Sequence, residues 1–176
     1  MKYKNIVPVQ VERILADDEI IISKTDTQGR ITYGNRQFHD YSGFLENELL
    51  GVQHNVVRHP DMPRAVFKLL WDEVQAGREV FAFVKNLCKD GSFYWVFANV
   101  TPSLDMEGNI LGYFSVRRKP NRSALPQVAG LYQKMLSAER QAGSRDAIQS
   151  STQILRDALK TEHATYEEWV LNLQNS

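Results

Sequence analysis

The sequence predicts an α+β fold in which one five-stranded antiparallel sheet carries short helices on one face and C-terminal helices follow. Three observations support it. β-rich stretches lie at both ends of residues 19–119, short helical patterns lie between them, and glycine-containing turns separate neighbouring strands. Strands joined by short turns pair antiparallel, and helices grouped between two sets of such strands are typical of an α+β domain.

The strands are expected in two groups. Ile20, Ile21 and Ile22 form a β-branched run, and residues 26–29 supply a four-residue turn before the chain resumes as a strand. The second group is separated by turns that contain Gly91 and Gly108. The five predicted strands cover residues 19–25, 30–33, 79–87, 92–103 and 110–119.

Between the groups, residues 35–50 predict short helices and residues 62–75 a longer one that ends before Gly77. The loop that leads into the longer helix, residues 54–63, contains two prolines and is therefore stiff. Asp61 is expected to cap the helix N-terminus. Arg58 and His59 are polar groups mounted on the same loop, where they could meet an anionic group.

Composition excludes several functional classes. Among 176 residues, 21 Lys and Arg balance 21 Asp and Glu, so no general attraction to nucleic acid is expected. The single Cys88 rules out an internal disulfide and fits a reducing compartment. No stretch reaches the roughly 18 apolar residues of a membrane span, and the N-terminus lacks a signal-peptide pattern. We therefore expect a cytoplasmic protein.

No chemistry-bearing pattern indicates an enzyme. Nucleophile–base arrangements, a phosphate-binding glycine motif and paired carboxylates are all missing from the sequence. His54, His59 and Asp61 do not have the spacing of a metal-binding set, so no metal site is predicted.

Several motifs resemble the PAS domains of aerotaxis receptors, over about residues 19–119. They are the loop at residues 54–63 and the runs at residues 68–71, 84–86, 89–96 and 98–102. The resemblance implies a PAS fold, non-covalent FAD binding, and transmission of redox state to a chemotaxis signalling module. It also implies flavin-binding roles for the residues that match the family motif: Asn35, Arg58, His59, Asp61, Trp71 and Asn86.

Residue chemistry is compatible with a flavin site. Asn86 and Asn99 carry amides whose donors and acceptors match the edge of the flavin ring, and Arg58 and His59 could meet phosphates. Aromatic side chains could form flat apolar walls, namely Trp71, Phe81, Phe83, Trp95 and Phe97.

Two alternatives remain open: a haem-binding sensor, for which one His suffices as an axial ligand, and a ligand-free interaction module. A flavin–thiol adduct is not expected, because Cys88 falls near a strand end rather than in the helical segment over the ring.

The chain is expected to divide into an N-terminal arm or short helix (residues 1–18), a PAS sensor domain (19–120) and a helical output or dimerisation segment (121–176). Apolar positions in the last segment, such as Leu131, Leu155 and Trp169, must be buried against the core, a partner or each other. The expected partners are a second copy of the chain or a signalling protein of the chemotaxis or two-component type.

Overall fold

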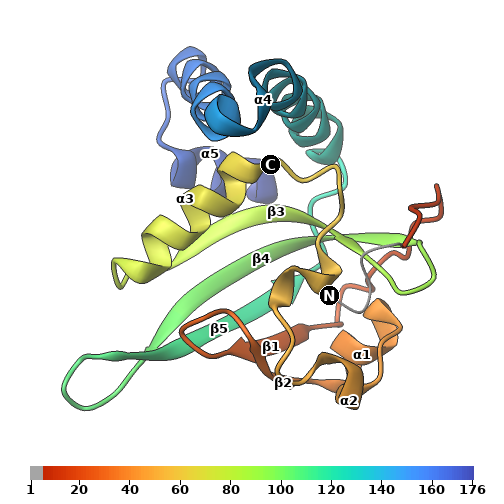
Figure 1. The fold of residues 1–176 in the computed structure, drawn as a ribbon. Helices are drawn as coiled ribbons and strands as arrows, with labels where there is room; N and C mark the ends of the chain where they lie inside the picture. Colours follow the sequence, from red (N-terminus) through yellow and green to blue (C-terminus); the bar gives the residue numbers. More distant parts are fainter. Residues whose placement is uncertain (1–5) are drawn as a thin grey trace.

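A single antiparallel sheet forms the centre of the computed structural model, which describes residues 6–176 (Figure 1). The first five residues of the expected N-terminal arm lie outside the described residues. The strands are β1 (Ile21–Thr25), β2 (Ile31–Gly34), β3 (Val80–Leu87), β4 (Phe93–Leu104) and β5 (Ile110–Arg118). Their order is β2-β1-β5-β4-β3, so the last strand pairs with the first and joins the two predicted groups. The predicted α+β fold is confirmed.

Four helical elements connect the two groups of strands. They are α1 (Arg36–Ser42), α2 (Glu46–Leu49), the 3-10 turn η1 (His54–Val57) and α3 (Arg64–Gln75). Asn35 caps α1, because its side-chain oxygen accepts the backbone N–H of Phe38 at 3.0 Å. The same oxygen accepts the backbone N–H of Ile22 at 2.9 Å, so one amide fixes α1 against β1.

The expected capping role of Asp61 is wrong. Helix α3 begins at Arg64, its N-cap residue is Pro63, and no side chain of the cap position bonds the helix. The Asp61 carboxylate instead lies 2.7 Å from the Lys85 ammonium. Lys85 is only 7% exposed, so its charge requires a nearby anion, and this requirement outweighs the local preference of Asp for a helix start.

The pairing register assigns the strand residues to two faces. Asn86 pairs with Tyr94, and Ala98 with Arg117, on the inward face beneath α3. Trp95 pairs with Lys85, and Phe97 with Phe83, so these residues point to the outward face because successive side chains alternate.

The C-terminal helices cover the outward face of β3 and β4. Helix α4 (Leu125–Thr161) is broken at Gly143, where φ is 71°, and α5 (Tyr166–Asn175) follows it. Tyr132 of α4 stacks on Trp95 and donates its hydroxyl to the carbonyl of Phe83 at 2.9 Å. Trp169 of α5 is buried in the same core. In Figure 1 these helices, coloured from teal to blue, lie with α3 at the β3 end of the sheet, far from α1 and α2.

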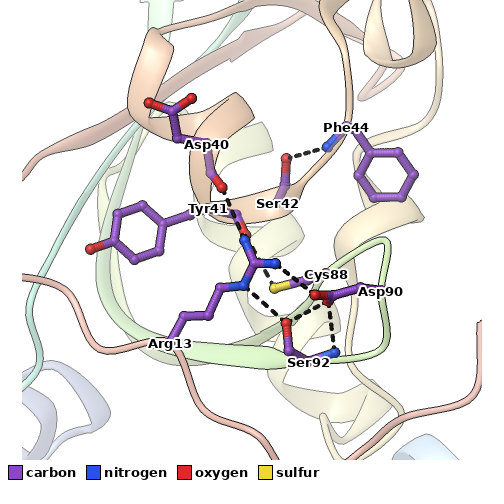
Figure 2. Close-up of polar contacts among 8 residues, drawn as sticks. All are labelled: Arg13, Asp40, Tyr41, Ser42, Phe44, Cys88, Asp90 and Ser92. Carbon is purple, nitrogen blue, oxygen red and sulfur yellow. Dashed lines mark hydrogen bonds and ion pairs between the residues drawn. The ribbon is translucent and has the colours of Figure 1, made fainter.

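Residues 6–18 contain no helix and run along the turn between β3 and β4. The backbone N–H of Val9 donates to the carbonyl of Gly91, and that of Arg13 donates to the carbonyl of Phe93. Figure 2 shows the Arg13 guanidinium reaching the Asp90 carboxylate, the Ser92 hydroxyl and the carbonyls of Asp40 and Tyr41. The arm therefore ties α1 to the β3–β4 turn.

Candidate ligand-binding site

A cavity opens between the inward face of the sheet, η1 and α3. Every strand except β2 contributes to it, because the inward positions of β1, β3, β4 and β5 all face the helices. Its lining comprises Ser23, Thr25, Gly29, Gln53, His54, Asn55, Val57, Arg58, Phe67, Leu70, Trp71, Val74, Val84, Asn86, Ala98, Val100, Tyr113, Ser115 and Arg117.

A polar cluster forms part of the cavity wall. The Nη2 atom of Arg117 donates to the Ser23 hydroxyl at 2.6 Å and contacts Nε2 of His54 at 2.7 Å. Phe38 supports both groups, since the His54 ring stacks on it and the Arg117 guanidinium lies 5.2 Å from its centre. Three elements, β1, β5 and η1, therefore meet in this cluster.

The protonation states of His54 and Arg117 are set by the surroundings of each side chain. Burial, and then the Arg117 charge, lower the pKa of His54 to about 3, so the imidazole is neutral at pH 7. Because Nε2 faces a guanidinium N–H, that nitrogen accepts and the ring proton resides on Nδ1. Burial lowers the pKa of Arg117 to about 10, which still leaves it charged at pH 7.

Two buried donors in the wall lack a partner. Within the described part of the chain, Nη1 of Arg117 and Nδ2 of Asn86 form no hydrogen bond. No Asp or Glu occurs among the described residues that line the cavity, although both Arg58 and Arg117 do. An unpartnered buried donor is costly, and a buried cation more so, so this wall is suited to an anionic or electron-rich ligand.

Arg58 lies beside the entry to α3. Its guanidinium stacks on the Phe67 ring at 4.4 Å, and its Nη2 atom donates to the carbonyl of Met62 at 2.7 Å. An isolated backbone bridge pairs Arg58 with Asn86 of β3. The predicted residues Arg58, Trp71 and Asn86 are thus brought together around one cavity.

Trp71 and the turn between β1 and β2 form the opposite end of the wall. The Trp71 ring meets Tyr113 edge-on, with ring centres 5.2 Å apart. Gly29 has a φ of +77°, and a Cβ there would lie 3.0 Å from the Trp71 ring. Glycine is required at this position both by conformation and by the close approach of the indole.

The other predicted residues lie outside the cavity lining. Asn35 caps α1, and Asn99 faces outward, where its amide donates to the Glu79 carboxylate at 3.1 Å. Trp95 faces outward against α4. The further aromatic wall residues Phe81, Phe83 and Phe97 also belong to the outward face.

His59 and Asp61 fix the loop to β3. The buried His59 ring accepts the backbone N–H of Asp61 at Nδ1, and burial followed by the Lys85 charge lowers the pKa of His59 to about 4. Partial burial opposes ionisation of Asp61, but the hydrogen bond and charge of Lys85 prevail and lower its pKa. These two residues are 3.5 Å apart at their side chains and stabilise the loop that carries Arg58.

Arg117 and Ser23 were not predicted from the sequence, and His54 was considered there only as a metal ligand. One signal was available: Arg117 shares the strand parity of Tyr113 and Ser115, so an inward-facing Tyr113 places the arginine inside as well. Among the described residues, no group of three or more His, Cys, Asp or Glu side chains is arranged to hold a metal ion. Cys88 is buried and donates its thiol to the carbonyl of Tyr41, away from the cavity.

Comparison with known proteins places this geometry in a family. The sequence pattern of the PAS fold matches residues 10–119. The chain is 44% identical to the aerotaxis receptor of Escherichia coli K12 over 126 residues, which are 72% of this chain and 24% of the receptor. It is 26% identical to the nitrogen fixation regulatory protein of Klebsiella pneumoniae over 99 residues, 56% of this chain and 20% of that protein.

A solved structure agrees with the fold. The light state of the blue-light photoreceptor Aureochrome1 LOV superposes with a TM-score of 0.53 at 25% identity, covering 69% of this chain and 93% of that one. Of residues 6–176, no helix has both the length and the hydrophobicity needed to cross a membrane. The resemblance inferred from the motifs is confirmed, and the chain belongs to the PAS-fold family, with an aerotaxis-receptor-type PAS domain.

Proposed function

We propose that this chain is a redox-sensing PAS domain that binds FAD non-covalently in the cavity between the sheet and α3. The observation that carries the proposal is the buried Arg117 guanidinium: among residues 6–176, its Nη1 donor has no partner and no carboxylate lines the cavity wall beside it. A flavin offers carbonyl oxygens along its pyrimidine edge and acquires negative charge at that edge when reduced. A cationic, donor-rich wall complements both properties.

Three residues from different elements would hold the ring. Asn86 can donate its free Nδ2 to a ring carbonyl, and Arg117 can donate its free Nη1. Trp71 supplies an aromatic wall. The remaining cation, Arg58, lies at the entry to α3 and suits a phosphate of the FAD tail.

The flavin supplies two-electron redox chemistry when it is bound, and the protein supplies the response. A gain of negative charge in the ring would strengthen its attraction to Arg117. The guanidinium would then be pulled away from Ser23 and His54, which its Nη2 atom now contacts. Because Ser23 belongs to β1 and Arg117 to β5, a change here acts on the strand pair that precedes the C-terminal helices. Moving a two-state output from 1:99 to 99:1 requires a difference of about 5.5 kcal/mol between redox states.

The relatives support a sensor role. One is an aerotaxis receptor, another is a nitrogen fixation regulatory protein, and the superposed structure is a photoreceptor. We therefore propose a cytoplasmic, non-enzymatic signalling function, with a second copy of the chain or a chemotaxis-type signalling protein as its partner. A haem is a weaker candidate: among the described residues that line the cavity the one histidine is His54, and its Nε2 already accepts from Arg117.

An absorption spectrum of the purified chain tests the proposal. Flavin bands and release of FAD on denaturation are expected, and dithionite should bleach the bands reversibly. Release of FMN instead would refute the FAD assignment alone. A Soret band would replace the flavin by haem, and failure of the apo chain to take up FAD, FMN or haem would leave the ligand-free interaction module.

A further inference from the structure

The N-terminus of helix α3 is capped by a side chain from the C-terminal helices. Its own N-cap position, Pro63, provides no side-chain acceptor. The backbone N–H groups of Arg64 and Ala65 donate to Oε1 of Glu139, at 2.7 and 3.3 Å. Free N–H groups at a helix start need acceptors, and a carboxylate is favoured there by the helix dipole. A residue of α4 therefore completes the first turn of α3.

The Glu139 carboxylate is buried and does not lie at the protein surface. The residue is 8% exposed, so its charge is held away from water. A buried carboxylate is tolerated only when hydrogen-bond donors or cations surround it. The two α3 amides supply the donors. Burial lowers the pKa of Arg58, and the nearby Glu139 carboxylate opposes this shift without reversing it.

The capped turn also supports the cavity. Phe67 lies one turn further along α3, and the Arg58 guanidinium stacks on its ring. Arg58 is further held by the carbonyl of Met62, immediately before Pro63. Both Phe67 and Arg58 line the cavity, so the position of the first turn of α3 sets the position of this part of the wall.

We propose that Glu139 is a positioning residue of the ligand site, through which ligand binding and docking of α4 strengthen each other. This inference rests on the proposed flavin site. The cap links the two events in one thermodynamic cycle: whatever the docked helix adds to ligand affinity, the ligand must add to docking. A partner that captures α4 would then weaken the ligand by the same factor.

The test uses the full chain, reconstituted with FAD and titrated by quenching of flavin fluorescence. E139A removes the acceptor and should weaken FAD binding about five-fold, the effect of losing a typical helix cap. E139Q retains an oxygen that accepts the same two N–H groups and should bind close to wild type. D146N removes one negative charge from an exposed position of the same helix and serves as the matched control.

Amide hydrogen exchange over residues 125–142 provides a second readout that simple destabilisation would not reproduce. FAD should slow exchange there in wild type and in E139Q, but not in E139A. Equal FAD affinity of E139A and wild type, or α4 exchange that ignores FAD in wild type, would overturn the inference and leave the flavin proposal intact. A wild-type chain that binds no FAD overturns both. Should E139A fail to fold, the wild-type exchange measurement alone decides.

Discussion

Arg117 and His54 face each other at 2.7 Å in the cavity wall, with the guanidinium as donor and a neutral imidazole as acceptor. The pair places a buried positive charge next to a base that cannot neutralise it. Folding alone gives no reason for such an arrangement, because an apolar residue would fill the position without the cost of desolvation. The charge is therefore better explained by ligand binding than by stability.

Replacing Arg117 with methionine should separate stability from ligand binding. The R117M chain without ligand should be as stable as wild type or more so, by about 1 kcal/mol, since a buried charge is removed and Ser23 can still donate to His54. FAD affinity should fall about 10- to 100-fold, because a charged hydrogen bond is lost. Urea unfolding of the apo chain and flavin titration measure the two effects.

R118M is the matched control, because Arg118 is the next residue of β5 and is exposed. It should leave FAD binding unchanged. The interpretation of Arg117 would be contradicted if R117M lost stability without losing FAD affinity.

The neutral His54 predicts an acid-dependent loss of stability. Its pKa is about 3 in the folded chain, below the value of about 6.5 expected when unfolded. Between these values the unfolded chain binds the proton and the folded chain does not, so stability is full above pH 6.5 and falls as pH decreases toward 3. The slope contributed by one such group is at most about 1.4 kcal/mol per pH unit.

His59 contributes in the same direction, since its folded pKa is lowered to about 4. H54Q keeps a side-chain acceptor for Arg117 but does not titrate. Urea unfolding at pH 7 and pH 5 should show a smaller pH dependence for H54Q than for wild type. If the pH dependence of stability were the same in H54Q and wild type, the pKa of His54 would have to be equal in the folded and unfolded chains, which would contradict this prediction.

Much of the fold was predictable from sequence because its signals are local. The turns at Gly91 and Gly108 and the β-branched runs define the strands, and the break at Gly143 appears as an interruption of the apolar pattern. The PAS motifs then fix the order of the elements. The N-terminus of α3 was the exception. Asp61 pairs with Lys85, which is distant in sequence, and does not cap the helix as its local preference would suggest.

The site was less predictable because it depends on which face of the sheet each strand residue occupies. Asn86 and Asn99 offer the same chemistry, and both strands are rich in aromatic residues. A strand buried on both faces shows no polar alternation that would separate inside from outside. The two faces are distinguished by contacts that are distant in sequence, such as the covering of Trp95 by Tyr132 of α4, 37 residues later in the chain.

The Asp61–Lys85 pair predicts an asymmetric response to mutation. D61A leaves a nearly buried ammonium without its carboxylate and should cost about 1–3 kcal/mol of the free energy of unfolding. K85M leaves only a partly exposed carboxylate that water can reach, so its cost should be smaller. Urea unfolding of both variants tests the order. A larger loss in K85M would mean that the contact of the Lys85 ammonium with the Phe93 ring, 4.1 Å from its centre, contributes more than the ion pair with Asp61.

The arm that precedes β1 contacts one of two glycines of similar conformation, so we expect alanine substitutions at the two positions to destabilise the protein to different extents. Gly91 and Gly108 have φ values of +88° and +86°, so alanine at either position carries a similar backbone strain of about 1–2 kcal/mol. A Cβ at Gly91 would lie 2.3 Å from the carbonyl oxygen of Val7, whereas at Gly108 it would meet nothing within 4 Å. G91A should therefore lose the arm contact in addition to the strain.

The excess destabilisation of G91A over G108A measures what the arm contributes. Hydrogen exchange should show faster exchange at Val9 and Arg13 in G91A only, since their backbone N–H groups bond this turn. R13A provides an independent route to the same state, because it removes the guanidinium that links Asp90 and Ser92 to α1 (Figure 2). If G91A and G108A were equally destabilised and the arm stayed protected in G91A, the arm would have to tolerate a shift at Val7 without loss of its contacts.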